Sequence, residues 1–123
     1  MNSINLQPAL VAIPEMAPGT ETHCDDAGML QLRRAVVPRG LIVRTLNRWF
    51  HHTDHVEVRL DAQGTFFWRQ IDGRRSLEDI ARDLARCFTL AESESREAVV
   101  VFTKMLMIRQ LIHLRVALPG ERV

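Results

Sequence analysis

"LDAQGTFFWRQIDGRRSLEDIARDLARCF" (Leu60–Phe88) contains two helix starts separated by a glycine. Asp61 is a typical N-cap residue, and the helix that it opens is expected to continue up to Gly73, since glycine suits the left-handed backbone that follows many helices. Ser76 and Asp79 have the spacing of a capping box, which predicts a second helix directly after the first. The stretch therefore predicts two short helices, each with its own cap.

Apolar side chains fall on one side of each predicted helix. Gly64 inside the first helix is unfavourable by about 1 kcal/mol relative to alanine, so we expect a neighbouring element to pack closely there. The aromatic residues at helical spacing are expected in the core: Phe66, Phe67 and Trp68. The apolar stripe of the second helix comprises Leu77, Ile80, Ala81, Leu84 and Phe88, with Cys87 on it or beside it.

Strand patterns precede these helices. Thr20–Cys24 and Met29–Val37 flank the turn sequence Asp25–Gly28, an arrangement that favours a β-hairpin. His55–Leu60 alternates apolar and polar residues, the pattern of a strand with one buried face. Three strands are therefore expected before the first helix.

A third helix is predicted after the second. Thr89 and Glu92 have capping-box spacing, and the helix that follows is expected to reach about His113. Around Phe102, one apolar stripe is expected in the core and comprises Ala98, Val101, Met105, Ile108 and Ile112. A second stripe on the opposite side comprises Val100, Met107 and Leu111. This second stripe needs a cover, which could be the N-terminal arm, an insert, a second copy of the chain or an apolar peptide.

The order of strands followed by helices is typical of the α+β class. We expect a small three-stranded antiparallel sheet packed on three helices, similar to a winged helix. Residues 1–18 are predicted to form an extended or disordered arm, residues 19–114 one domain, and residues 115–123 a tail. Within the domain, residues 37–53 form a basic amphipathic insert. For Trp49 and Phe50 in that insert, a satellite core, partner docking and contact with a membrane surface all stay open.

Composition excludes several classes of protein. Apolar residues make up 46% of the 123 residues and charged residues 25%, which is ordinary for a globular protein. The formal charge of +1 provides no overall attraction to nucleic acid. No apolar run approaches the roughly 20 residues of a membrane span, and the N-terminus lacks the basic region of a signal peptide. With two cysteines at no metal-binding or redox spacing, the sequence predicts a cytoplasmic protein with reduced thiols.

The sequence contains no recognisable catalytic or metal-binding constellation. His51, His52 and His55 lie close together, yet no further ligands complete a tetrahedral set, so surface histidines are expected. Cys87 is predicted inside a helix, and Cys24 stands at a turn without a base positioned by any motif. We therefore predict that the chain is not an enzyme and that it uses no cofactor and no metal.

Nucleic acid is the main rival partner. Strands with three helices resemble a winged helix-turn-helix, and five arginines without an acid lie between Ala27 and Thr53. However, the third helix begins with Glu92, Glu94 and Glu97, whereas reading of DNA bases favours basic or amide side chains at such positions. The sequence argues against DNA binding, which stays an alternative beside a structural or dimerising module.

The same residues resemble the PqqD-like family, named after protein D of pyrroloquinoline quinone biosynthesis. The segments that carry the resemblance are Leu60–Phe88 and "FTKMLMIRQLI" (Phe102–Ile112), within a region from about Thr20 to His113. The matching positions are Leu60, Asp61, Gly64, Trp68, Ile71, Asp72, Gly73, Ser76, Ile80, Leu84, Phe88, Phe102, Leu106, Leu111 and Ile112. They are structural positions rather than catalytic ones.

The resemblance implies a recognition element for ribosomally made, modified peptides. Such a domain binds the leader of a precursor peptide as an added strand on the edge of its last β-strand, beside the third helix. It presents the peptide to a modifying enzyme, often a radical S-adenosylmethionine maturase, in natural-product biosynthesis. The implied peptide-binding residues are His55, Val56, Glu57, Val58, Arg59 and Leu60 on the strand, with Arg96, Val100, Thr103, Lys104 and Met107 on the helix. The arginine and the lysine on that helix would suit an acidic leader.

Two features depart from the family pattern. Gln110 stands where the family usually has glycine, so the third helix is expected to end differently. The insert at residues 37–53 is longer than the loop of a minimal member, so it is expected either to cover the edge strand or to dock the enzyme.

Overall fold

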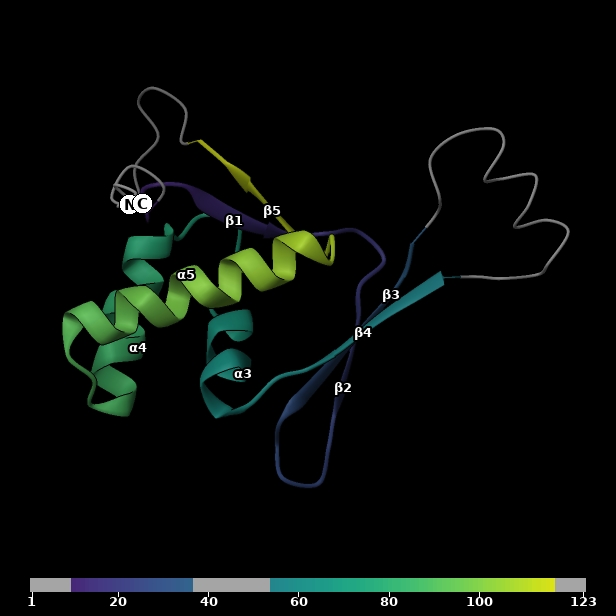
Figure 1. Cartoon of the computed structure of the whole chain (residues 1–123), viewed down its shortest axis with the longest axis horizontal. Helices are drawn as coiled ribbons and strands as arrows, with labels where there is room; N and C mark the ends of the chain where they lie inside the picture. Colours follow the sequence, from purple (N-terminus) through teal and green to yellow (C-terminus); the bar gives the residue numbers. More distant parts are fainter. Residues whose placement is uncertain (1–9, 37–53, 117–123) are drawn as a thin grey trace, which may run out of the picture.

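The computed structural model describes residues 10–36 and 54–116 and contains two antiparallel sheets and three helices in that part of the chain (Figure 1). The larger sheet has the order β2 (Glu21–Cys24), β3 (Leu30–Val36) and β4 (Asp54–Arg59). The smaller sheet pairs β1 (Ile13–Met16) with β5 (Ile112–Arg115). The predicted α+β class, with a small three-stranded antiparallel sheet and three helices, is confirmed, while the winged-helix arrangement stays a prediction.

The helices lie on one side of the larger sheet in the view of Figure 1, and β1 and β5 run together above them. They are α3 (Ala62–Arg69), α4 (Leu77–Phe88) and α5 (Glu92–Ile108). None of the described helices is long and apolar enough to cross a membrane. The predicted insert at residues 37–53, with Trp49, Phe50 and two of the histidines, lies outside the described residues.

The β-hairpin predicted around Asp25–Gly28 is confirmed. One carboxylate oxygen of Asp25 accepts hydrogen bonds from the backbone N–H groups of Ala27 and Met29, both at 2.9 Å. Gly28 adopts φ +85°, a left-handed conformation that glycine adopts without strain. Short side-chain bonds at the turn thus set the register in which β2 pairs with β3.

Helix α3 starts where predicted but ends earlier. The Asp61 carboxylate accepts a hydrogen bond from the Gly64 N–H at 2.8 Å, as expected of an N-cap. The predicted continuation to Gly73 is wrong, because α3 ends at Arg69. The Asp72 carboxylate instead accepts bonds from the N–H groups of Arg74 and Arg75, both at 2.8 Å. This local alternative to helical bonding, followed by Gly73 at φ +78°, turns the chain into the next helix.

Helix α4 has the predicted capping box, with reciprocal bonds of 3.1 Å between Ser76 and Asp79. Its predicted stripe is confirmed in Leu77, Ile80, Ala81 and Leu84, which are buried, while Phe88 is half-buried. Cys87 is exposed, so its predicted place at the buried stripe is wrong. It stands in the last turn of α4, where the neighbouring Phe88 rather than Cys87 packs against the core.

The predicted capping box of the third helix is also wrong. Thr89 ends α4 in a left-handed conformation at φ +55°, and α5 begins after Ala91 without a side-chain cap. The connection between the two helices is so short that Thr89 serves the end of the first rather than the start of the second. The capping-box spacing considers the start of one helix alone. It therefore could not show that Thr89 is also needed at the end of α4.

Helix α5 ends at Ile108 rather than near His113. Gln110 has φ +60°, the Gln110 N–H donates to the Met107 carbonyl, and the Leu111 N–H donates to the Leu106 carbonyl, both at 2.9 Å. This pattern is a Schellman motif, which usually has glycine at the left-handed position. Gln110 thus takes the conformation that glycine usually adopts at this position, and the chain turns directly into β5. The expected difference from the family pattern stays a prediction.

A single core joins the helices to the sheets. Phe67 and Trp68 are buried, as predicted, and Phe66 is half-buried. A Cβ atom on Gly64 would lie 3.2 Å from the Phe102 ring and 3.3 Å from the Leu60 Cβ, which confirms the predicted close packing. The other buried core residues are Leu10, Leu30, Leu32, Val58, Ile71, Val99, Leu106, Leu111 and Ile112.

The described part of the N-terminal arm packs on the domain. Leu10 and Ile13 are buried, whereas Val11 is exposed, so part of the arm enters the core. Glu15 contacts His113 at 2.8 Å and Arg115 at 3.3 Å across the pair of strands β1 and β5. The N- and C-terminal parts of the chain are thereby held together. The exact limits of arm, domain and tail stay a prediction.

Candidate functional site

The outer edge of β4 is an exposed strand edge within the described residues. The sheet order places β3 on one side of β4 and no described strand on the other. The Leu60 N–H donates to the Leu30 carbonyl at 2.9 Å, so residue 60 is bonded towards β3. Because an antiparallel ladder alternates, the N–H groups of Val56 and Val58 also point to β3, and those of His55, Glu57 and Arg59 point away. This edge can therefore accept another strand.

The side chains of β4 alternate as predicted from the sequence. Val58 and Leu60 are buried and Val56 is half-buried, whereas Glu57 and Arg59 are exposed. Glu57 lies 3.7 Å from Arg33 on the solvent face of the sheet. The strand is anchored by one face, while its outer edge has no partner strand among the described residues.

Helix α5 buries a face that was not predicted. Ser95, Val99, Thr103 and Leu106 are buried, whereas Val101 is 61% exposed and Ile108 is 78% exposed. The predicted core stripe of Ala98, Val101, Met105 and Ile108 is therefore wrong for its two most exposed members, and Ile112 lies beyond the helix in β5.

Two polar residues, Ser95 and Thr103, lie in the core where apolar residues were predicted, and both hydroxyls are hydrogen-bonded. The Ser95 hydroxyl donates to the Ala81 carbonyl of α4 at 2.5 Å. The Thr103 hydroxyl donates to the Val99 carbonyl one turn earlier at 2.7 Å. A buried hydroxyl with a partner costs little, so the two small residues allow α4 and α5 to pack closely.

Four apolar residues on this side of α5 form a feature that we call the outer stripe: Val101 and Ile108, which are exposed, and Ala98 and Met105, which are half-buried against the core. Phe102 lies beside the outer stripe on the helix, and its ring stacks on Phe67 of α3 with centroids 5.7 Å apart. The same ring approaches Gly64 next to Leu60, the residue that follows β4. The outer stripe thus borders the side of α5 that faces α3 and the end of β4.

The helix residues implied by the family resemblance have different surroundings. Arg96 donates to Glu78 of α4 at 2.8 Å, and this hydrogen bond, together with the charge of Glu78, raises the pKa of the guanidinium. Thr103 is buried with its hydroxyl already bonded. Val100 is half-buried, while Lys104 and Met107 are exposed. Arg96 and Thr103 are therefore engaged within the protein, and the other three are accessible.

Met107 is exposed in the last turn of α5. It lines a shallow hollow together with Pro18, Gln110 and Arg34 of the central strand β3. Met107 therefore lies near Arg34 of β3, whereas the Phe102 ring lies near Gly64 and Leu60, just after the end of β4.

Arg34 is a site residue that sequence reasoning missed. Its Nε donates to the Pro18 carbonyl at 3.2 Å, and its Nη1 donates to the Gln110 carbonyl at 2.5 Å. The strand position was a usable signal, because Leu30 and Leu32 precede Arg34 on the same alternating face. An arginine at such a position needs polar partners from another element.

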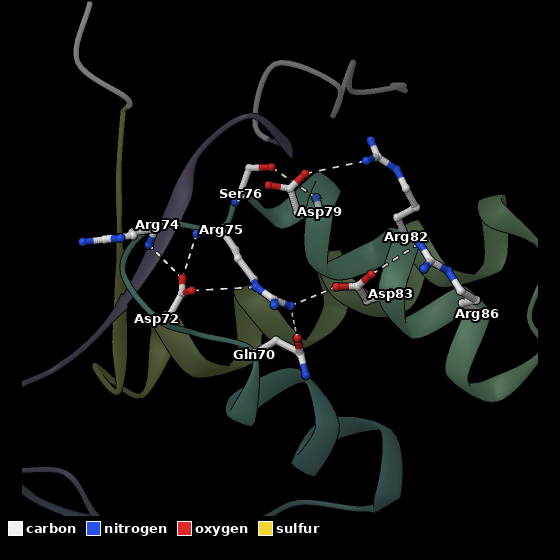
Figure 2. A network of polar contacts seen from close by, with 9 residues as sticks. All are labelled: Gln70, Asp72, Arg74, Arg75, Ser76, Asp79, Arg82, Asp83 and Arg86. Carbon is white, nitrogen blue, oxygen red and sulfur yellow. Dashed lines mark hydrogen bonds and ion pairs between the residues drawn. The ribbon is translucent and has the colours of Figure 1, made fainter. Parts of the chain in front are cut away.

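A network of charged residues joins α3 to α4 (Figure 2). Arg75 lies at its centre, hydrogen-bonded to Gln70 and to Asp83, the latter at 2.9 Å, with Asp72 at 3.7 Å. Burial raises the pKa of Asp72, but the N–H bonds from Arg75 and Arg74 and the charge of Arg75 outweigh it, so the pKa is lowered overall. Arg75 thus contacts Gln70 at the end of α3 and Asp83 of α4. The network therefore stabilises the connection between the two helices.

The described residues include no group of three His, Cys, Asp or Glu side chains that could hold a metal ion. Cys24 and Cys87 are both free and exposed. The described features that stand out as a binding surface are therefore an open strand edge and an exposed apolar helix face.

Comparison with known proteins adds the family. Residues 51–112, 62 of the 123 in the chain, match the family model described as Coenzyme PQQ synthesis protein D (PqqD). No curated protein and no solved structure matches the chain. The matched region begins just before β4 and ends at the first residue of β5, so it contains the open strand edge and all three described helices. The chain belongs to the PqqD family.

Proposed function

We propose that this chain is a non-catalytic peptide-binding protein that takes up the leader of a ribosomally made precursor peptide and presents it to a modifying enzyme. The observation that carries the proposal is the outer edge of β4, whose backbone groups lack a described partner strand. The exposed apolar residues Val101 and Ile108 of α5 support it. Membership of a family named for coenzyme PQQ synthesis supports a role in the same kind of biosynthesis.

The leader adds as an antiparallel or parallel strand to His55–Leu60. Main-chain hydrogen bonds of an added strand supply affinity for many sequences, because every peptide carries the same N–H and C=O groups. The outward N–H groups of His55, Glu57 and Arg59 are the donors on this edge. Val56, Val58 and Leu60 hold the strand to the core and keep the edge extended.

Side-chain specificity comes from α5. The outer stripe offers an apolar surface for alternate side chains of the leader, with Val101 and Ile108 as its most exposed members. Lys104 on α5 and Arg59 on β4 are exposed and have no described ion-pair partner, so they suit acidic residues of the leader. Val100 and Met107 form a second apolar surface on the opposite side of α5, and Arg96 and Thr103 are engaged within the protein.

The partner that receives the peptide is a modifying enzyme, and the family resemblance points to a radical S-adenosylmethionine maturase. The same outer stripe would also suit a second copy of this chain. A second copy of the chain thus competes with the leader peptide for the outer stripe. The binding experiment has to distinguish dimer formation from peptide binding.

A fluorescence-anisotropy titration with labelled leader peptides from short reading frames adjacent to this gene tests the proposal. We expect binding at micromolar or tighter affinity, weakened about tenfold or more by Val101→Glu or Ile108→Glu. Val11→Glu is the matched control, because Val11 is 63% exposed against 61% for Val101 but belongs to neither β4 nor α5. The proposal fails if none of these peptides binds, or if Val101→Glu abolishes a concentration-dependent dimer and leaves peptide affinity unchanged.

A further inference from the structure

Arg34 connects three segments that are distant in the sequence. It lies in β3 opposite Val56 of β4, and its guanidinium donates to the carbonyls of Pro18 and Gln110. Pro18 precedes β2, and Gln110 follows the last turn of α5. One planar group thereby fixes the central strand of the sheet to the end of the helix that carries the outer stripe.

The chemistry of this contact is suited to holding a helix end. Backbone carbonyls at a helix C-terminus carry partial negative charge, which favours a cation there. The two donors of Arg34 point in fixed directions, because the guanidinium is planar and rigid. Gln110 is also the residue with the left-handed backbone, so Arg34 binds α5 at the point where the chain turns into β5.

Within the described residues, one side-chain hydrogen bond joins the three-stranded sheet to the segment that ends α5. It runs from Arg34 to the Gln110 carbonyl. The other side-chain bond from this sheet to a helix joins the Leu30 N–H to Thr65 of α3. The distance from α5 to β3 sets the distance from α5 to β4, because β3 and β4 are joined by a continuous ladder.

We propose that Arg34 is a positioning residue that sets the distance between α5 and β4. This inference rests on the proposed function for its biological meaning, but the geometry itself is independent of any peptide. The side chain does not touch the leader. It determines whether a strand on β4 and side chains on the outer stripe can be contacted at the same time.

Distance measurements between spin labels test the geometry without a peptide. Labels at Arg59→Cys and Lys104→Cys, in a Cys24→Ser, Cys87→Ser background, report the separation of β4 from α5. We expect one narrow distribution with Arg34 and a broader or shifted one with Arg34→Met. Arg34→Lys, which keeps the charge but cannot serve both carbonyls, should give an intermediate result, so the test survives if Arg34→Met fails to fold.

Arg33→Met is the matched control, because Arg33 is the neighbouring arginine, exposed on the opposite face, and contacts only Glu57 among the described side chains. It should leave the distribution unchanged. An unaltered distribution in both Arg34 variants would overturn the proposal, as would an equal change in Arg33→Met.

Leader affinity, measured without the labels, provides the second readout. Arg34→Met should weaken binding about tenfold, with Arg34→Lys partly restoring it and Arg33→Met leaving it unchanged. If the distances change as expected but no leader binds to the unaltered protein, the proposed function is wrong and the positioning role of Arg34 stands. If leader binds and Arg34→Met changes neither distance nor affinity, the positioning role is wrong and the proposed function stands.

Discussion

At the scale of single residues, Gln110 carries a conformational cost that its neighbours offset. Its φ of +60° is a backbone region that favours glycine, and a side chain there costs on the order of 1 kcal/mol. The Schellman bonds of Gln110 and Leu111, together with the bond from Arg34 to the Gln110 carbonyl, hold this conformation in place.

Replacing Gln110 with glycine should therefore stabilise the protein. We expect Gln110→Gly to raise the free energy of unfolding by up to about 1 kcal/mol, measured by urea denaturation, because the strain of the left-handed residue is removed. Gln63→Gly is the control, since the same substitution inside α3 should destabilise by about 1 kcal/mol. An equal loss of stability in both variants would show that Gln110 is not strained.

The Asp72 carboxylate makes the free energy of unfolding depend on pH. Its pKa is lowered in the folded protein from the ordinary value of 3.8, so folding favours the charged carboxylate. The resulting stabilisation is fully present above that ordinary value and is lost as the pH falls through the lowered pKa. Asp72→Asn should therefore reduce the loss of stability between about pH 4 and pH 2, measured by denaturation at each pH, whereas Asp26→Asn in the exposed hairpin turn should change it less.

Caps and turns formed by local side chains were the most predictable features at this scale. Asp61, Ser76 and the Asp25 turn follow from bonds that span four residues or fewer, so the sequence alone identifies them. Thr89 and Asp72 were misjudged because each could serve two adjacent segments, and tertiary packing decided between them.

At the scale of elements, α5 shows how apolarity alone can select the wrong face. Val99, Val100, Val101 and Phe102 are consecutive, so every side of the helix carries an apolar residue. The buried side was settled by Ser95 and Thr103, whose hydroxyls find carbonyl partners in the close contact with α4 and within α5. By contrast, β4 alternates strictly, and its buried and exposed residues were predicted correctly.

A pair of alanine substitutions checks the orientation of α5. Leu106 is fully buried and Ile108 is 78% exposed, although both are large aliphatic residues in the last turn. Leu106→Ala should lower the free energy of unfolding by about 3 kcal/mol, and Ile108→Ala by less than about 0.5 kcal/mol, measured by urea denaturation. A larger loss in Ile108→Ala than in Leu106→Ala would mean that the originally predicted face is the buried one.

At the scale of the whole molecule, β1 and β5 form the connection that local patterns could not predict. Ile13–Met16 and Ile112–Arg115 are almost a hundred residues apart, and with four residues each they are too short to be identified as strands from sequence, although Ile112–Arg115 alternates apolar and polar residues. Their pairing closes the domain and directs α5 into its turn at Gln110. The strand edge of the candidate site was predictable, but the helix face beside it depended on this long-range packing.

The central claim is that a leader peptide adds as a strand to the outer edge of β4. The described sheet has a second free edge on β2, where the N–H groups of Thr22 and Cys24 point outward by the same alternation. This second edge provides an internal control within one protein and one spectrum.

Amide hydrogen exchange followed residue by residue by NMR, with and without a bound leader peptide, tests the claim most directly. The account predicts that the amides of His55, Glu57 and Arg59 become protected on binding. The amides of Val56 and Val58, already bonded to β3, and those of Thr22 and Cys24 on β2 should change little. Protection on β2, or binding that leaves the three outward amides of β4 unprotected, would contradict it.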